Sequence, residues 1–330
     1  MGNSDRMLEK GLNRREFLMG LAATGTLLSL GQTNSLKAEP RVTVNVFSKH
    51  FQWLDHNGMA EAIAEVGFDG VDLTVRPGGH VLPERVEEDL PKVAEACKKS
   101  GIKISLMTTN ITDPNDPITE KVLRTASKLG IGHYRFGYWY YDEKRDIVEQ
   151  LKEIKVKMSG VAELNKKYKI FGGNQNHSGT RYFGNAVWDT WEIVKDLDAN
   201  YIGFQYDPQQ ALNEGIGGSW EISARLVVPY TKTFVVKTQA EWGSSEWTKA
   251  VRREGKRLEI ITYNEFKWYF SLMKNAGFSG PITAHYEFPG LGGVENGNKE
   301  LKGITRNELI TIMRRNLTIL RDMLKETGLA

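Results

Sequence analysis

The chain has 330 residues, of which 40% are apolar and 26% are charged; this composition is typical of a globular protein with one large domain or two smaller ones. The formal net charge is only +3 and the basic residues are scattered, which argues against a nucleic-acid partner. The single cysteine, Cys97, excludes an internal disulfide framework.

The first 38 residues differ in character from the rest and look like a twin-arginine signal peptide. Arg14 and Arg15 precede an apolar, glycine-containing run over residues 19–30, and Ala38 offers a cleavage site. The run is shorter than the roughly 20 residues that a membrane-spanning helix needs. We therefore expect export to the periplasm of a mature chain, 39–330, that keeps no membrane anchor.

From residue 41 onward, short apolar runs typical of buried parallel strands alternate with amphipathic helical patterns. The expected strands cover residues 42–47, 70–75, 102–107, 132–136, 168–172, 201–205, 233–237 and 281–286. The expected helices cover residues 59–66, 83–100, 118–129, 142–167, 185–196, 220–229, 263–276 and 306–327. Several of the helical patterns stop at a glycine, as helices commonly do.

Eight strands, each followed by a helix, predict an α/β fold of one domain, a (β/α)8 TIM barrel. The competing doubly wound sheet normally has a glycine-rich turn after its first strand, and residues 47–53 contain none. Residues 240–258 form a longer polar insertion after the seventh strand, and we expect them to lie as a loop over the mouth of the barrel.

Polar side chains gather where the predicted strands end, which is where barrels of this kind carry their active sites. Four of the six histidines are among them. The full set is His50, His80, Tyr138, Gln175, His177, Asp207, Gln210, Lys237, Gln239, His285 and Glu287. Asp207 and Glu287, with a histidine and an amide oxygen, have the chemistry of a site for manganese, magnesium or zinc. The alternative is a satisfied hydrogen-bond network at the barrel rim.

Aromatic residues are frequent in the segments after the first, fourth and seventh strands. Aromatic faces stack on sugar rings, so an aromatic rim over polar groups suits a carbohydrate ligand. Trp188 and Trp191 have helical spacing and fit packing between helix and barrel. Trp242 and Trp247 lie in the polar insertion and are better candidates for ligand contact.

Four stretches carry a resemblance to the xylose isomerase-like TIM-barrel family of sugar phosphate isomerases and epimerases. They are residues 67–80 and 175–179, Gln205-Tyr206-Asp207, and His285-Tyr286-Glu287. The resemblance runs in order from about residue 41 to the end of the chain. It implies a divalent metal held by a Glu, an Asp, a His and a Glu after strands five to eight, with the two glutamates moving a proton through an enediolate.

This sequence departs from that pattern at two positions. Asp207 and Glu287 match the aspartate and the last glutamate, but Gln175 stands in place of the first glutamate. The histidine after strand seven is missing, and Lys237 follows two valines there. A glutamine does not accept a proton near neutral pH, so a histidine would have to replace the lost base.

The sequence and the resemblance together predict a sugar isomerase or epimerase that removes a proton next to a carbonyl with the help of a divalent metal. The expected catalytic residues are Glu287, His177, His80 and Lys237; the expected substrate-binding residues are His50, Tyr138, Gln210, Trp242 and Gln239; the expected metal ligands are Gln175, Asp207, His285 and Glu287. Two alternatives stay open, a lyase or hydrolase acting on keto-glycosides and a carbohydrate-binding barrel without catalysis. The oligomeric state also stays open.

Overall fold

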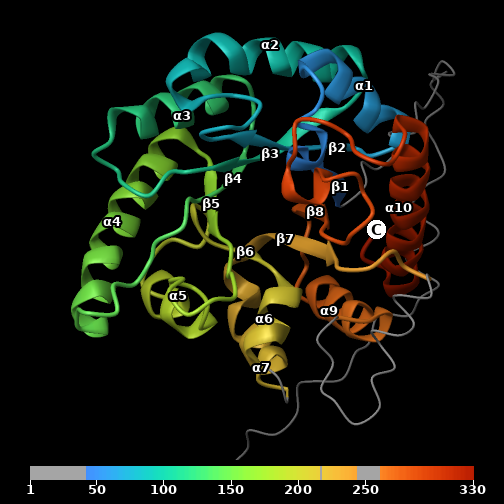
Figure 1. Ribbon diagram of the computed structural model, residues 1–330. Helices are drawn as coiled ribbons and strands as arrows, with labels where there is room; N and C mark the ends of the chain where they lie inside the picture. Colours follow the sequence, from blue (N-terminus) through green and yellow to red (C-terminus); the bar gives the residue numbers. More distant parts are fainter. Residues whose placement is uncertain (1–41, 216–217, 244–260) are drawn as a thin grey trace, which may run out of the picture. The chain divides into compact units, whose positions relative to one another are not determined.

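The computed structural model describes residues 42–215, 218–243 and 261–330. The predicted signal peptide, the greater part of the predicted 240–258 loop and Trp247 lie outside these residues. The unit Pro40–Ala330 is compact, and within it the strands close into one parallel barrel in the order β1 to β8 (Figure 1). The predicted (β/α)8 barrel is therefore confirmed.

The strands lie close to their predicted positions. They are β1 Thr43–Phe47, β2 Gly70–Val75, β3 Lys103–Thr109, β4 His133–Arg135, β5 Phe171–Asn174, β6 Ile202–Tyr206, β7 Thr231–Thr238 and β8 Pro281–Tyr286. The helices around them are α1 His56–Val66, α2 Val86–Lys99, α3 Pro117–Lys128, α4 Ile147–Tyr168, α5 Val187–Val194, α6 Pro208–Glu214, α7 Ser219–Val227, α9 Tyr263–Asn275 and α10 Arg306–Thr327.

The boundaries of β5 and α4 show why some predictions were displaced. Tyr168 is the last residue of α4, and Lys169 takes a left-handed conformation with φ of 53° that ends the helix. The strand therefore begins at Phe171, three residues later than predicted. At its other end, α4 begins at Ile147 instead of 142, because Asp146 is the N-cap and its side chain accepts a hydrogen bond from Glu149 N at 2.9 Å.

Helix α6 was not predicted, although its start has a recognisable signal. Asp207 accepts a hydrogen bond from the backbone of Gln210 at 3.2 Å, and Pro208 occupies the first helical turn. An acidic N-cap followed by proline is a common helix start. This helix begins directly after the end of β6, with Asp207 as the residue between them.

The register of the strands determines which side chains face the barrel interior. In β7 and β8, Lys237 is paired with His285, and in parallel neighbours paired residues share a face. Phe47 at the end of β1 stacks on His285 with ring centroids 4.6 Å apart. The ends of β7, β8 and β1 thus present adjacent side chains at the mouth.

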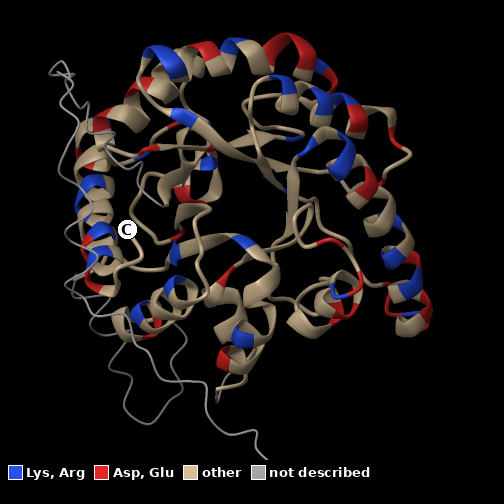
Figure 2. Cartoon of the chain, turned by 180° about the vertical axis from the view of Figure 1, so that it is seen from behind, with Lys and Arg blue, Asp and Glu red and all other residues tan. Residues whose placement is uncertain are grey.

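Charged residues cover the outer helices. In the view of Figure 2, acidic and basic segments alternate around the ring of helices, and many are paired within one helix, such as Lys92 with Glu88 at 2.8 Å. Among the described residues, no helix has both the length and the apolar character needed to cross a membrane.

Candidate active site

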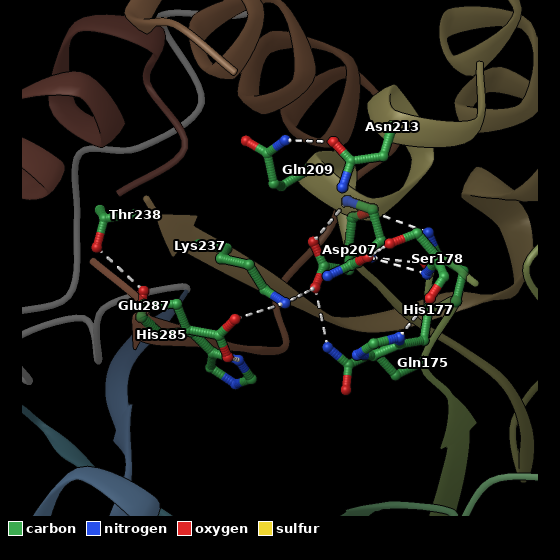
Figure 3. A network of polar contacts seen from close by, with 12 residues as sticks. Gln175, His177, Ser178, Asp207, Gln209, Asn213, Lys237, Thr238, His285 and Glu287 are labelled. Atoms are coloured by element: carbon green, nitrogen blue, oxygen red, sulfur yellow. Dashed lines mark hydrogen bonds and ion pairs between the residues drawn. The ribbon is translucent and has the colours of Figure 1, made fainter. Parts of the chain in front are cut away.

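Lys237 is the centre of the polar cluster at the barrel mouth. It lies at the end of β7, is 2% exposed, and its Nζ is 3.3 Å from Asp207 Oδ2 and 3.3 Å from Glu287 Oε2. Figure 3 shows the ammonium between the two carboxylates. Burial lowers the pKa of Lys237, but the attraction of Asp207 and Glu287 outweighs it, and the pKa stays above its ordinary value. The lysine is therefore a permanent cation.

Asp207 is held rigidly. Its Oδ2 also accepts a hydrogen bond from Gln175 Nε2 at 2.9 Å. The side chain of Asn176 makes two hydrogen bonds to the backbone of Asp207. Its amide oxygen accepts from Asp207 N at 2.8 Å, and its amide nitrogen donates to Asp207 O at 2.9 Å. With its side chain fully buried and its partners fixed by β5, β6 and α6, Asp207 is suited to hold Lys237 in place.

Glu287 is the more accessible carboxylate, with 29% of its side chain exposed. Besides Lys237 it pairs with Lys49, whose Nζ lies 3.1 Å from Oε1. Burial raises the pKa of Glu287, but the two lysines reverse this effect and lower the pKa to about 2. Burial also lowers the pKa of Lys49, against the opposing attraction of Glu287. Glu287 is ionised at every pH near neutrality.

His285 is buried, and neither ring nitrogen has a hydrogen-bond partner in the described part of the chain. Its Nδ1 lies 3.9 Å from Glu287 Oε1. Burial and the neighbouring Lys237 and Lys49 hold the pKa of His285 well below its usual value, so the imidazole is neutral. It offers one donor and one acceptor at the mouth.

Gln175 links this cluster to β4. Its Oε1 accepts from the Tyr138 hydroxyl at 3.0 Å and from Arg135 Nη1 at 3.4 Å. The Arg135 guanidinium also lies over the Tyr138 ring, 4.4 Å from its centroid. The amide oxygen and the amide nitrogen of Gln175 therefore both have hydrogen-bond partners, and the nitrogen faces Asp207.

His177 and Gln210 lie on the far side of Asp207. His177 Nδ1 donates to Ser178 O at 2.9 Å, and its ring stacks on Tyr182 at 4.5 Å. Burial lowers the pKa of His177. Gln210 Oε1 accepts from Ser178 N at 2.9 Å and also contacts the Ser178 hydroxyl. These contacts shape the loop after β5 and leave the other nitrogen of His177 free of any described bond.

Two further predicted histidines are occupied by backbone groups. His50 is fully buried; its Nδ1 donates to Val294 O and its Nε2 accepts from Tyr286 N, each at 3.0 Å. His80 bonds Thr74 Oγ1 and Phe51 O, each at 3.2 Å. These bonds tie loops to the barrel rim. The His50 ring lies edge-on to His285, with ring centroids 6.4 Å apart, but both of its nitrogens are already bonded to the backbone. His80 makes no described contact with the cluster around Lys237.

Trp242 and Gln239 follow β7. Trp242 is 4% exposed and packs edge-on against Tyr263 and Phe266 of α9, so it belongs to the packing between helix and barrel. Gln239 is half-buried. Neither side chain reaches the cluster through a described contact.

Three cations at the mouth were missed by sequence reasoning: Lys49, Arg76 and Arg135. Lys49 and Arg76 lie within two residues of the ends of the predicted first and second strands, and Arg135 lies near the end of the fourth. The strand-end rule that selected the other candidates also applies to them. Among lysines and arginines, however, the candidate set contained Lys237 alone.

The metal site implied by the resemblance finds no matching donor set. Among residues 42–215, 218–243 and 261–330, no group of three or more His, Cys, Asp or Glu side chains could hold a metal ion. Gln175 turns its amide nitrogen toward Asp207, and the Lys237 ammonium lies between the two carboxylates. A divalent cation there would face a fixed positive charge, so these residues do not fit it.

Comparison with protein families matches residues 60–307 to the family described as "Xylose isomerase-like TIM barrel". Among solved structures, a D-psicose 3-epimerase with D-tagatose from Clostridium cellulolyticum H10 is 15% identical, with a TM-score of 0.61 over 86% of this chain and 99% of that one. A 3-keto-D-glucoside 4-epimerase from E. coli is 10% identical, with a TM-score of 0.61 over 85% and 99%.

A D-allulose 3-epimerase from Methylomonas sp. is 14% identical, with a TM-score of 0.58 over 86% of this chain and 99% of that one. At these identities the likeness shows a shared fold. A search of curated proteins gave no match.

Proposed function

Because the chain belongs to the xylose isomerase-like TIM barrel family, we propose that it is a sugar isomerase or epimerase that transfers a proton next to a carbonyl group. The observation that carries the proposal is the convergence of an ammonium, a carboxylate and an unpartnered imidazole at the ends of β7 and β8. Several structures of the same fold are sugar epimerases, which supports this class of reaction.

Lys237 takes the electrophilic role. A sugar carbonyl oxygen that accepts a hydrogen bond from the ammonium gains stabilisation as negative charge develops on it. The ammonium is already positioned by Asp207 at 3.3 Å, so little reorganisation is needed. Since the donor set does not fit a divalent cation, the lysine supplies the positive charge at this position.

Glu287 acts as the base. Its carboxylate removes the proton from the carbon beside the carbonyl and becomes a neutral acid, while the electron pair moves onto the carbonyl oxygen to form an enediolate. With a pKa of about 2 in the free site, the carboxylate is a weak base. A substrate oxygen that draws Lys237 away from Glu287 raises that pKa, which couples substrate binding to base strength.

His285 completes the site; it lies on β8, where it is paired with Lys237 of β7. Its unpartnered nitrogens bond the substrate hydroxyl and carry its proton between oxygens when an enediolate collapses to the isomeric carbonyl. Return of the carbon-bound proton to the adjacent carbon gives isomerisation. Delivery of a proton to the opposite face of the same carbon gives epimerisation, and it needs an acid other than Glu287, which then loses its own proton to solvent.

The test is exchange of carbon-bound hydrogen with solvent. The purified mature chain is incubated in D2O with ketohexoses and with 3-keto-glucosides, and deuterium incorporation is followed by proton NMR. We expect incorporation beside the carbonyl of at least one of these sugars. Glu287→Gln should reduce the exchange rate by about 10²-fold or more in a chain that still unfolds in one cooperative transition, although its stability falls because the ion pairs with Lys237 and Lys49 are lost.

Two outcomes would contradict the proposal. Exchange by the Glu287→Gln variant at the wild-type rate would remove Glu287 from the base role. Binding of these sugars without exchange by the wild type would favour a carbohydrate-binding barrel. The same spectra show release of a free aglycone, which would indicate a lyase or hydrolase.

We also propose that the mature chain acts in the periplasm, on the strength of the paired-arginine segment at residues 14–15. Fractionation of cells that express the full chain, with and without Arg14→Lys and Arg15→Lys together, tests this location.

A further inference from the structure

Arg135 is a buried cation at the barrel mouth whose charge is not neutralised by a described contact. It is 3% exposed, its Nη1 donates to Gln175 Oε1 at a long 3.4 Å, and its Nε has no partner among the described residues. Its guanidinium also lies over the Tyr138 ring. Buried charges are costly unless they are paired, so an unpaired guanidinium at this place calls for an explanation.

Arg76, which follows β2, is a second, half-buried guanidinium at the mouth. It lies over the Phe47 ring, 5.4 Å from the centroid, and it makes no ion pair with a described residue. Burial and the nearby Arg135 lower the pKa of Arg76, which places the two guanidiniums within electrostatic reach of one another. Two like charges held close together favour an anion between or beside them.

The carboxylates of the mouth do not satisfy this pair. Asp207 and Glu287 are already engaged by lysines. Burial raises the pKa of Asp72 to about 6, while the nearby Arg135 and Arg76 act to lower it, so this carboxylate lies within electrostatic reach of both guanidiniums. Its Oδ1 accepts from Thr108 Oγ1 at 2.9 Å. It forms no described ion pair with either arginine. The pair therefore keeps donors free for a bound anion.

We propose that Arg76 and Arg135 bind the carboxylate of an acidic sugar and thereby orient its carbonyl toward Lys237. Arginine presents planar pairs of donors that match a carboxylate. The mouth has four cations, Lys49, Arg76, Arg135 and Lys237, against the two anions Asp207 and Glu287, with Asp72 nearby. With Asp72 ionised, the surplus is one positive charge, which matches a carboxylate better than a doubly charged phosphate.

The arginine pair is also connected to the reacting groups. Phe47 contacts Arg76 on one hand and stacks on His285 on the other, and Gln175 joins Arg135 to Asp207. A ligand held by the two arginines would therefore lie close to His285 on one side and to Asp207 on the other. The inference rests on the proposed function in that the ligand is taken to be a sugar.

The proposal is tested by calorimetry, which measures the affinity of sugars for the full mature chain. D-glucuronate and D-galacturonate are the acidic probes. D-glucose and D-galactose are the matched neutral probes, and D-glucose 6-phosphate is the phosphate probe. We expect at least one acidic sugar to bind about 10-fold or more tightly than its neutral parent, because a charge-assisted pair is formed. Equal affinity of both acids and their parents, or a preference for the phosphate, would overturn the proposal.

Variants locate the effect. Arg135→Met and Arg76→Met should each weaken binding of the acidic sugar by about 10- to 100-fold and leave that of the neutral sugar within about twofold. Arg124→Met is the matched control, since Arg124 pairs with Glu87 on the outer helices. Arg135→Lys keeps the charge without the planar donors and should give an intermediate loss, which separates recognition from a folding defect.

Failure of the two proposals can be told apart. A wild-type chain that prefers the acidic sugar through Arg76 and Arg135 but never exchanges deuterium would refute the isomerase and keep the carboxylate site. Deuterium exchange on neutral sugars, with no preference for acids, would do the reverse.

Discussion

Four histidines follow strands at the same barrel mouth, and they form two pairs that differ in how their ring nitrogens are bonded. His50 and His80 have both ring nitrogens bonded to backbone or hydroxyl groups. Neither nitrogen of His285 has a hydrogen-bond partner within the part of the chain that the structure describes, and His177 uses only Nδ1 in a described bond. The first pair holds loops in place, and the second pair is available to a ligand.

The difference shows that position at the end of a strand does not by itself make a residue catalytic. A side chain acts on a substrate only if its donors and acceptors are not already used by the protein. Burial alone does not separate the pairs either, because His50 and His285 are both buried. The bonding of the ring nitrogens separates them.

Among the four histidines, His285 should give the largest effect on turnover when it is replaced, as in His285→Gln. The amide cannot relay a proton as an imidazole does, so deuterium exchange should fall by about 10²- to 10⁴-fold. The unfolding free energy should fall by about 0.5–1.5 kcal/mol, because the stacking on Phe47 is lost but no described hydrogen bond is. Exchange within threefold of wild type would place His285 with the structural pair.

His50→Ala should give the largest effect on stability. The substitution leaves the Val294 carbonyl and the Tyr286 amide without their partner, and we expect a loss of about 2–5 kcal/mol in the unfolding free energy. Urea denaturation measures it. A loss below that of His56→Ala, a more exposed histidine with one described bond, would show that His50 is not a structural anchor.

The same histidine should make stability depend on pH. Burial and Lys49 lower the pKa of His50 from 6.5 to about 3. Below pH 6.5 the unfolded chain takes up a proton that the folded chain refuses until about pH 3, so stability is lost as pH falls through this window. At pH 5 the loss from this group reaches about 2 kcal/mol. His50→Gln, which retains an acceptor for Tyr286 N, should show a flatter profile than wild type between pH 6.5 and 4. Parallel profiles would contradict the account.

His80→Ala should give the smallest effect. Its bonds to Thr74 and Phe51 are partly exposed, and we expect a cost of about 1 kcal/mol with deuterium exchange unchanged. The catalytic role predicted for His80 from the sequence would be supported if exchange instead collapsed while the chain stayed folded.

Much of the fold was predictable because strand and helix periodicity repeats eight times along the chain. The displaced start of β5 depended on one left-handed residue, Lys169, which no periodicity indicates. At the site, the sequence identified Asp207, Lys237 and Glu287 by their strand-end positions. It did not show that the lysine lies between the carboxylates, because that depends on the register of three strands and on the direction of each side chain.

The central claim is that the Lys237 ammonium occupies the place where the family resemblance implies a divalent cation. Manganese titration by calorimetry tests it on two chains, the wild type and the double variant Gln175→Glu with Lys237→His, which restores the implied Glu, Asp, His and Glu. We predict no binding to the wild type at millimolar manganese and one site in the double variant. Stoichiometric, micromolar binding of manganese to the wild type, lost in Asp207→Asn, would contradict the account.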